Sequence, residues 1–379
     1  MWRAVEPVSK NHTMKKNTAI YSLCMTMALL ILTASCKDDL PVLTSYSLIE
    51  GGDAYSVALK PDGSLWAWGY NYYGQLGDGS FDDKTNQTFI GTGYASVSAG
   101  AVHTLAIKSD GTLWAWGSNA SGQLGDGSLN DKLLPVQIGS GYSFISAGLY
   151  HSLALKSDGT LWAWGENGRG QLGDGSTVDR MSPVLIGSGY TMISAGSEHS
   201  LAIKADGSVW AWGINTYGQL GDNTKVSKKM PIQIGSDFLS IAAGSNHSLG
   251  LKKDGSLWSW GLNAYGQLGD GTTSNKSIPV LVGSGFTAIA AGFHSLALKS
   301  DGSLWAFGFN GAGELGDGTN TDKHTPTMIG SEFKTIAAGF EHSLALKTDG
   351  TFWSWGLNSG GQLGDGTYKN QSIPVKVGL

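Results

Sequence analysis

Residues 65–79 read LWAWGYNYYGQLGDG, and close copies of this stretch recur along the whole chain. Its first tryptophan falls at Trp66, Trp114, Trp162, Trp210, Trp258, Trp305 and Trp353, so the successive intervals are 48, 48, 48, 48, 47 and 48 residues. The short interval arises where AGFHS (291–295) has one residue fewer than AGSNHS (243–248). A fixed period of this size indicates a repeat architecture in which each copy is one supersecondary unit.

Each repeat divides into four short apolar segments, which predict four β-strands. In the copy at 142–188 they are YSFISAG (142–148), HSLALK (151–156), LWAWG (161–165) and PVLIG (183–187), with alternation of period two. The sequence SDGT (157–160) predicts a type I′ hairpin turn between the second and third strands. A single four-stranded sheet cannot bury both faces, but seven sheets stacked around an axis can. We therefore predict an all-β fold, a seven-bladed β-propeller over residues 46–379.

The two ends of the chain both resemble the fourth strand of a repeat. These segments are PVL (41–43), within a short linker at 37–45, and IPVKVGL (373–379). We expect one of them to act as a closing strand that completes a blade built by the opposite terminus.

The N-terminus predicts export from the cytoplasm. From Met14, the expected true start, the chain reads MKKNTAIYSLCMTMALLILTASCKDD, which has the basic, apolar and small-residue regions of a signal peptide. The ending Thr33-Ala34-Ser35-Cys36 resembles the lipobox of bacterial lipoproteins, in which the cysteine is lipidated after cleavage. We expect residues 1–36 to be a signal peptide with its lipobox ending at Cys36, and the protein to be lipid-anchored in the bacterial cell envelope, at the outer membrane or cell surface. The alternative is a plain cleaved signal with an incidental cysteine.

Composition narrows the classes of partner. The chain has 57 glycines, 10% aromatic residues, 15% charged residues and a net charge of −5, a composition typical of short strands and tight turns rather than disorder. Without residues 1–36 there remain 21 basic and 29 acidic residues, a net charge of −8. Such an acidic chain makes nucleic acid a poor candidate partner. We expect a monomer that contacts the membrane through the N-terminal lipid alone.

With the repeat written out, the motifs A-G-x-x-H-S-L-A-L, D-G-x-L-W-A-W-G and N-x-x-G-Q-L-G resemble those of the family named for the regulator of chromosome condensation (RCC1-type repeats). The resemblance spans residues 46–379 and implies a seven-bladed propeller, but not one function. Nuclear members of this family are exchange factors for the GTPase Ran and carry a wedge insertion and a basic tail, whereas these repeats are uniform and acidic. Plant ultraviolet photoreceptors of this type carry Gly-Trp-Arg-His-Thr segments, which this sequence lacks. A secreted bacterial relative inhibits β-lactamases.

The repeated residues are expected to form the scaffold. The paired tryptophans point to the same side of a strand, which favours packing between blades over light sensing or ligand stacking. The histidine of each repeat favours a structural role, in which it satisfies a backbone group in the turn, over metal binding, and Tyr55 holds the same place in the first repeat. The Gly-Asp-Gly loops favour structural turns over calcium or phosphate binding. These structural residues are Trp66, Trp68, Trp114, Trp116, Trp162, Trp164, Trp210, Trp212, Trp258, Trp260, Trp305, Trp353, Trp355, His103, His151, His199, His247, His294 and His342.

Function is expected where the repeats differ, because loops on a rigid scaffold usually carry recognition. The variable turns and long loops are predicted to share one end of the propeller, and their candidate partner-binding residues are Tyr72, Tyr73, Tyr150, Arg169, Glu198, Tyr217, Tyr265, Phe340 and Glu341. We predict a non-enzymatic module that binds a protein or glycan, without cofactor or metal. The alternatives are an enzyme of lyase or hydrolase type acting at the central channel, and a guanine-nucleotide-exchange regulator like the nuclear family members.

Overall fold

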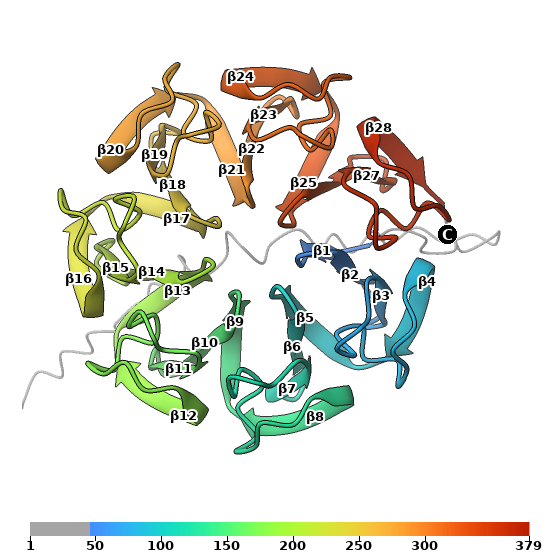
Figure 1. The fold of residues 1–379 in the computed structure, drawn as a ribbon, viewed down its shortest axis with the longest axis vertical. Coiled ribbons are helices and arrows are strands. Elements are labelled where there is room, and N and C mark those ends of the chain that lie inside the picture. The colour runs from blue at the N-terminus through green and yellow to red at the C-terminus, as the bar shows by residue number, and fades with distance from the viewer. Residues whose placement is uncertain (1–45, 379) are drawn as a thin grey trace, which may run out of the picture. The chain divides into compact units, whose positions relative to one another are not determined.

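A computed structural model describes residues 46–378 as seven four-stranded antiparallel sheets arranged around a central channel (Figure 1). The predicted all-β, seven-bladed propeller is confirmed. The predictions for the signal peptide, for Met14 and Cys36, and for the linker at 37–45 lie outside the described residues. Within residues 46–378, no helix is long and apolar enough to cross a membrane.

The two inner strands of each blade carry the turn that varies between repeats. The innermost strands, which line the channel, are β1 (Leu48–Gly51), β5 (Tyr94–Ala99), β9 (Tyr142–Ala147), β13 (Tyr190–Ala195), β17 (Phe238–Ala243), β21 (Phe286–Ala291) and β25 (Phe333–Ala338). The second strands, almost wholly buried, are β2 (Tyr55–Leu59), β6 (His103–Lys108), β10 (His151–Lys156), β14 (His199–Lys204), β18 (His247–Lys252), β22 (His294–Lys299) and β26 (His342–Lys347).

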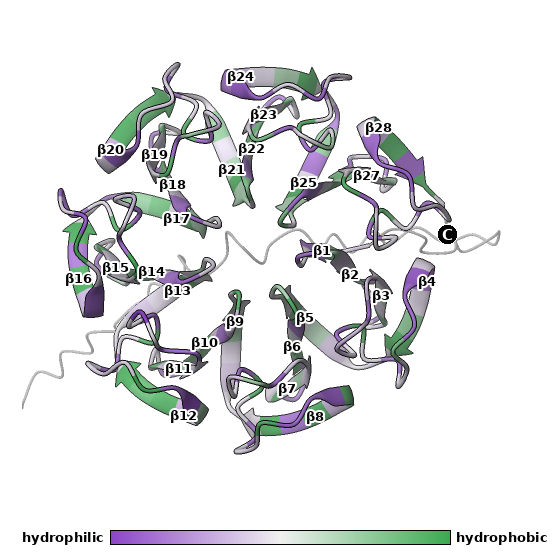
Figure 2. Ribbon diagram, viewed as in Figure 1, coloured by the Kyte–Doolittle hydropathy of each residue, from purple (hydrophilic) through white to green (hydrophobic). Residues whose placement is uncertain are grey.

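The two outer strands of each blade are joined by the long loop. The third strands are β3 (Leu65–Gly69), β7 (Thr112–Gly117), β11 (Leu161–Gly165), β15 (Val209–Gly213), β19 (Leu257–Gly261), β23 (Leu304–Gly308) and β27 (Phe352–Gly356). The outermost strands are β4 (Lys84–Gly91), β8 (Lys132–Ser140), β12 (Arg180–Gly187), β16 (Lys228–Gly235), β20 (Lys276–Gly283), β24 (Lys323–Gly330) and β28 (Gln371–Val377). Figure 2 shows hydrophobic stretches on several of these outer strands, where Leu185 and Met230 are exposed.

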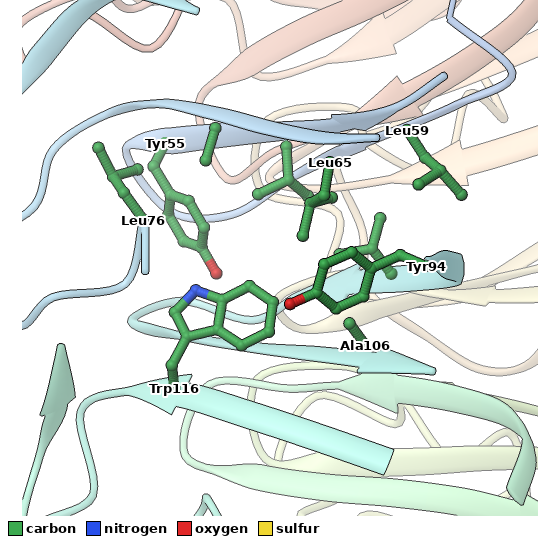
Figure 3. Packing of buried hydrophobic residues seen from close by; sticks show 10 residues of the cluster. Tyr55, Leu59, Leu65, Leu76, Tyr94, Ala106 and Trp116 are labelled. Atoms are coloured by element: carbon green, nitrogen blue, oxygen red, sulfur yellow. The ribbon is translucent and has the colours of Figure 1, made fainter. Parts of the chain in front are cut away.

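The core consists of apolar clusters, each formed between two adjacent blades. In the cluster of Figure 3, Tyr55, Leu65 and Leu76 of the first blade pack against Tyr94 and Trp116 of the second. All five side chains are buried. Because every blade offers one face to the preceding blade and one to the next, both faces of each small sheet are removed from water.

The ring closes through contacts between two complete blades rather than through a shared blade. The sheet orders β1-β2-β3-β4 and β25-β26-β27-β28 show that the first and last blades are each built from four strands consecutive in sequence. The first and seventh blades meet through a buried cluster that includes Ile49, Trp68, Leu344 and Phe352. The expectation that one terminus completes the other's blade is therefore wrong for the described residues, and PVL (41–43) lies outside them.

The predicted type I′ turn is also wrong. A type I′ turn needs positive φ at both central residues, but at this hairpin Gly159 alone has it, at 79°. The amide of Lys156 donates to the carbonyl of Thr160, and that of Gly159 to the carbonyl of Lys156, both at 2.9 Å, which defines a three-residue loop with a left-handed glycine. The reason is Asp158, whose Oδ1 accepts the Thr160 amide at 2.9 Å and its hydroxyl at 2.6 Å.

Candidate functional site

The second tryptophan of each LWAWG motif joins its blade to the preceding blade. Trp116 is fully buried, and its Nε1–H donates to the backbone carbonyl of Gln75 at 3.0 Å. The same bond forms from Trp68, Trp164, Trp212 and Trp355. In the sixth blade Phe307 fills this place and is equally buried. These indoles contact neighbouring blades rather than a site open to solvent.

The first tryptophan of each motif lies at the end of the propeller where hairpin turns join the second and third strands. It is half-buried beneath a lysine. Trp114 donates from Nε1 to the Thr112 hydroxyl at 2.8 Å, and Lys108 Nζ lies 4.1 Å from its ring centroid. The same lysine is 5.3 Å from the Tyr94 ring. Each of the seven blades repeats this arrangement of a lysine over two aromatic rings.

Each of the six repeat histidines forms a hydrogen bond with a serine of the next blade. His151 Nε2 lies 3.0 Å from the Ser200 hydroxyl of the next blade, and that hydroxyl donates to the carbonyl of Gln171 at 2.8 Å. Because the serine proton is used in this way, Nε2 carries the hydrogen and donates. The equivalent pairs are His103–Ser152, His199–Ser248, His247–Ser295, His294–Ser343 and His342–Ser56.

The structure places these histidines differently from the sequence-based expectation. Their partner is a hydroxyl of the adjacent blade, whereas a backbone group of the turn was expected. Tyr55 occupies the same position, with its hydroxyl 2.6 Å from the His103 carbonyl and 2.9 Å from the Thr104 hydroxyl. Burial lowers the pKa of each histidine to about 3, which keeps the rings neutral. Since Nε2 is already bound to serine, it is not free to bind a metal.

The Asn-x-x-Gly-Gln-Leu-Gly-Asp-Gly loop is held by its own polar side chains. Asn71 is fully buried; its Nδ2 donates to Asp78 Oδ1 at 3.1 Å, and its Oδ1 accepts the Leu76 amide at 3.0 Å. Asp78 also accepts the amide and hydroxyl of Ser80 and pairs with Lys84 at 3.3 Å. The carboxylate is thus fully used in holding the loop. Across residues 46–378, no group of three or more His, Cys, Asp or Glu side chains is arranged to hold a metal ion.

The variable turns and the long loops lie together at one end of the propeller, which we call the loop face. The amide of Tyr70 donates to the backbone carbonyl of Ala54 in the first blade, and the amide of Glu166 donates to the backbone carbonyl of Tyr150 in the third. Among the predicted partner-binding residues, Tyr72, Tyr150, Arg169, Tyr217 and Tyr265 are exposed; the others, Tyr73, Glu198, Phe340 and Glu341, are partly buried.

Two groups of aromatic rings stand on the loop face. In the first blade, Tyr72 is 5.1 Å from Tyr73 and stacks on Tyr70 at 6.3 Å between ring centroids. A second group crosses three blades. Its rings run from Tyr265 to Phe309 at 5.2 Å, from Phe309 to Phe293 at 6.1 Å, and from Phe293 to Phe340 at 4.3 Å.

Sequence reasoning missed Tyr70, Phe293 and Phe309. Two signals in the repeat could have found them. Tyr70 and Phe309 follow the glycine that ends the third strand, a position that reads Tyr, Ser, Glu, Ile, Leu, Phe and Leu in the seven repeats. Phe293 is the one residue left between Gly292 and His294 in the shortened turn of the sixth repeat.

The central channel encloses about 240 Å³ and is lined mainly by serine, alanine and glycine of the innermost strands. Glu50 and Asp53 are its two ionisable lining residues, both from the first blade. Burial raises the pKa of Glu50 to about 7 and also raises the pKa of Asp53.

Comparisons with known proteins place this geometry in a family. The model of the RCC1-like domain matches residues 33–234 and 96–379. A comparison with curated proteins found no match. Among solved structures, human WBSCR16 is similar with a TM-score of 0.76 and 23% identity, over 84% of this chain and 94% of that chain. Prp20p from Saccharomyces cerevisiae is similar with a TM-score of 0.75 and 26% identity, over 89% of this chain and 88% of that chain. The family model covers far more than half of the sequence, and the seven blades carry its repeats throughout. The chain belongs to the RCC1-like domain family.

Proposed function

We propose that this protein is a non-enzymatic binding module that recognises another protein through its loop face. The observation that carries the proposal is the contrast between the two ends of the propeller. At the end opposite the loop face, every blade repeats the same arrangement of a lysine over two aromatic rings. At the loop face, Tyr72, Tyr217 and Tyr265 are exposed at repeat positions where the residue type changes from blade to blade. Exposed tyrosines on a rigid frame are typical of binding hot spots.

A family relative supports a protein as the partner. The structure of Prp20p is described together with its binding to Gsp1p and histones, so a propeller of this type recognises proteins. At 26% identity that likeness does not carry either partner over to this chain. We propose a protein partner over a glycan, and a monomeric propeller that presents a single loop face to it.

The envelope location forms part of the same proposal. The sequence resembles a lipobox ending at Cys36, and lipidation there would anchor the propeller to a membrane through residues 37–45. Metabolic labelling with a fatty acid tests this step, with Cys36→Ala as the variant and Cys24→Ala as the matched control. Label that survives Cys36→Ala would contradict the anchor.

Affinity capture from envelope extracts tests the binding function. Tagged full-length protein is compared with a variant in which Tyr72, Tyr73, Tyr217 and Tyr265 are changed to alanine. A matched control changes four exposed residues of the outermost strands to alanine, namely Leu185, Met230, Leu281 and Met328. We expect one partner to be captured by the wild type and the control but not by the loop-face variant. Equal capture by all three proteins would exclude the loop face, and the absence of any specific partner would exclude the binding function.

A further inference from the structure

The shortened turn of the sixth blade brings two phenylalanines together at the inner edge of the loop face. Phe293 is the single residue between Gly292 and His294, and its amide donates to the carbonyl of Phe340 at 2.9 Å. The two rings are 4.3 Å apart. Other blades have two residues in this turn, so this aromatic contact depends on the deletion that also breaks the 48-residue period.

Acidic residues of the first and seventh blades adjoin this aromatic pair. The amide of Phe340 donates to the carbonyl of Gly52 at 3.0 Å, which holds the turn containing Phe340 and Glu341 against the turn containing Asp53. Burial, with the charge of Asp53 in addition, raises the pKa of Glu341. The charge of Asp53 thus lies close enough to Glu341 to add to the effect of burial, which is the larger cause of the rise.

The outer part of the loop face shows the opposite arrangement of charge. Six of the seven Gly-Asp loop carboxylates each pair with a lysine or arginine, at 2.6 to 3.3 Å. The seventh, Asp365, accepts a hydrogen bond from Gln371 at 3.2 Å. Among residues 46–378 no ion pair involves Asp53 or Glu341. Six of the seven carboxylates of the outer ring are thus neutralised within the protein, and the inner pair is not.

Tyr70 lies beside the turn that carries Asp53, and its amide donates to the carbonyl of Ala54 at 2.9 Å. Its side chain is partly buried, and burial, together with several nearby groups that include Asp53, raises the pKa of its phenol. Gly360 of the seventh blade lies beside it, since a Cβ there would be 3.0 Å from Tyr70 Cβ. The turn that carries Asp53 therefore adjoins Phe340 of the seventh blade, through Gly52, and Tyr70 of its own blade, through Ala54.

We propose that Asp53 and Glu341, flanked by Phe340 and Tyr70, form a recognition site for an arginine or lysine side chain on an exposed segment of a protein partner. This inference rests on the proposed binding function and names the chemistry of the partner. A cation is attracted both to unpaired carboxylates and to the faces of aromatic rings. The chain already uses the second contact at its other end, where Lys108 Nζ lies 4.1 Å from the ring centroid of Trp114.

Binding to short peptides of defined charge tests the site without the natural partner. Fluorescein-labelled hexa-arginine and hexa-glutamine peptides are titrated into the full-length protein. The test variant is Asp53→Asn with Glu341→Gln, and Phe340→Leu tests the aromatic contact. The matched control, Asp237→Asn with Glu332→Gln, removes the same two charges at the opposite end of the propeller. Thermal unfolding of each variant checks that it is folded.

We expect hexa-arginine, but not hexa-glutamine, to bind, with affinity that falls as salt is added. The test variant should weaken binding about tenfold and Phe340→Leu several-fold, while the control stays near wild type. Equal weakening by test and control variants would show that net charge alone attracts the peptide, and would overturn the site. The cation site would also be overturned, in favour of a glycan site, by a different pair of results. These are that an uncharged chitin hexasaccharide displaces hexa-arginine, and that the test variant binds hexa-arginine as well as wild type does.

The inference and the proposed function fail on different results. A partner captured from envelope extracts that requires the loop-face tyrosines, but still binds Asp53→Asn with Glu341→Gln, contradicts the cation site and leaves the binding function standing. Failure to capture any specific partner contradicts the binding function, while the peptide titration still decides whether the cation site exists.

Discussion

The six buried histidines of the repeats predict that the propeller loses stability in weak acid. Burial lowers the pKa of His151 in the folded protein to about 3, whereas an unfolded histidine titrates near pH 6.5. A group whose pKa is depressed by folding contributes stability that is present above its unfolded pKa and is lost as pH falls. The neutral ring must stay neutral, because a proton on Nδ1 would place an unpaired charge inside the protein. Replacing one such histidine should therefore reduce the dependence of stability on pH.

The size of the effect follows from the two pKa values. Between about pH 6 and pH 4, each buried histidine should cost about 1.4 kcal/mol of folding stability per pH unit. At about pH 5 the loss per histidine is about 2 kcal/mol, and six of them are comparable with the total stability of an ordinary domain. Glu50 and Glu314 act in the opposite direction, because their raised pKa values near 7 make the folded protein less stable as pH rises. A comparison of variants isolates the histidine contribution.

The assay is urea unfolding at several pH values between about 7.5 and 5, for wild type and His151→Gln. Glutamine can still donate to Ser200, so the variant keeps a hydrogen bond but has no group that titrates. We expect the free energy of unfolding of His151→Gln to fall with acid about 1 kcal/mol less per pH unit than that of wild type. His324 is exposed, so His324→Gln is the control and should match the wild-type slope. Identical slopes for His151→Gln and wild type would refute a neutral, buried ring.

Three further predictions concern single side chains of the scaffold, and each is read from thermal or urea unfolding. Glu314→Gln restores the amide found in the other repeats and removes a buried carboxyl whose pKa is raised to about 7 by burial. The variant should therefore be more stable than wild type by about 1–2 kcal/mol at about pH 8 and by much less at about pH 5. An equal gain at both pH values would contradict this. Gly148→Ala would place Cβ 2.6 Å from a neighbouring carbonyl oxygen and should cost several kcal/mol, roughly 3 or more, whereas Gly168→Ala meets no atom within 4 Å and should be near neutral. Trp164→Phe loses one buried hydrogen bond but keeps an aromatic ring, as Phe307 does naturally, and should cost about 1–2 kcal/mol; a loss above about 4 would mean that the indole has another role.

Periodicity alone was enough to predict the blades. The alternation in HSLALK and the paired tryptophans of LWAWG predict strands, and the constant period indicates that every copy folds into a sheet of the same kind. The structure has four strands in each blade, at nearly the positions expected from the repeat at 142–188. These features are local or repeated, so one copy of the motif carries the information for all.

Features that depend on side-chain hydrogen bonds or on one particular junction between blades could not be predicted in this way. The Asp-Gly dipeptide fits two hairpin turns, and the turn observed is the one in which Asp158 accepts the amide and hydroxyl of Thr160, a choice that the dipeptide alone does not state. Ring closure depends on whether the first and last blades can each assemble from consecutive strands, which no repeat pattern states. The contact between Phe293 and Phe340 joins residues that are 47 positions apart in sequence through a deletion, and it becomes visible only when the blades are placed side by side.

The hydrogen bonds between blades also explain why the loop face is where function is expected. In the first long loop, the carbonyl of Gln75 accepts both the Thr104 hydroxyl and the Trp116 indole, so the loop holds the adjacent blade as well as its own. The Gln75 side chain holds the loop in this shape, because its Oε1 accepts the Tyr73 amide at 3.0 Å, and the position reads Gln or Glu in every repeat. Tyr72, by contrast, uses its side chain in no hydrogen bond of the described residues and is 63% exposed. Recognition can change at Tyr72 and its neighbours without cost to the ring, because the bonds that position the loop come from residues on either side.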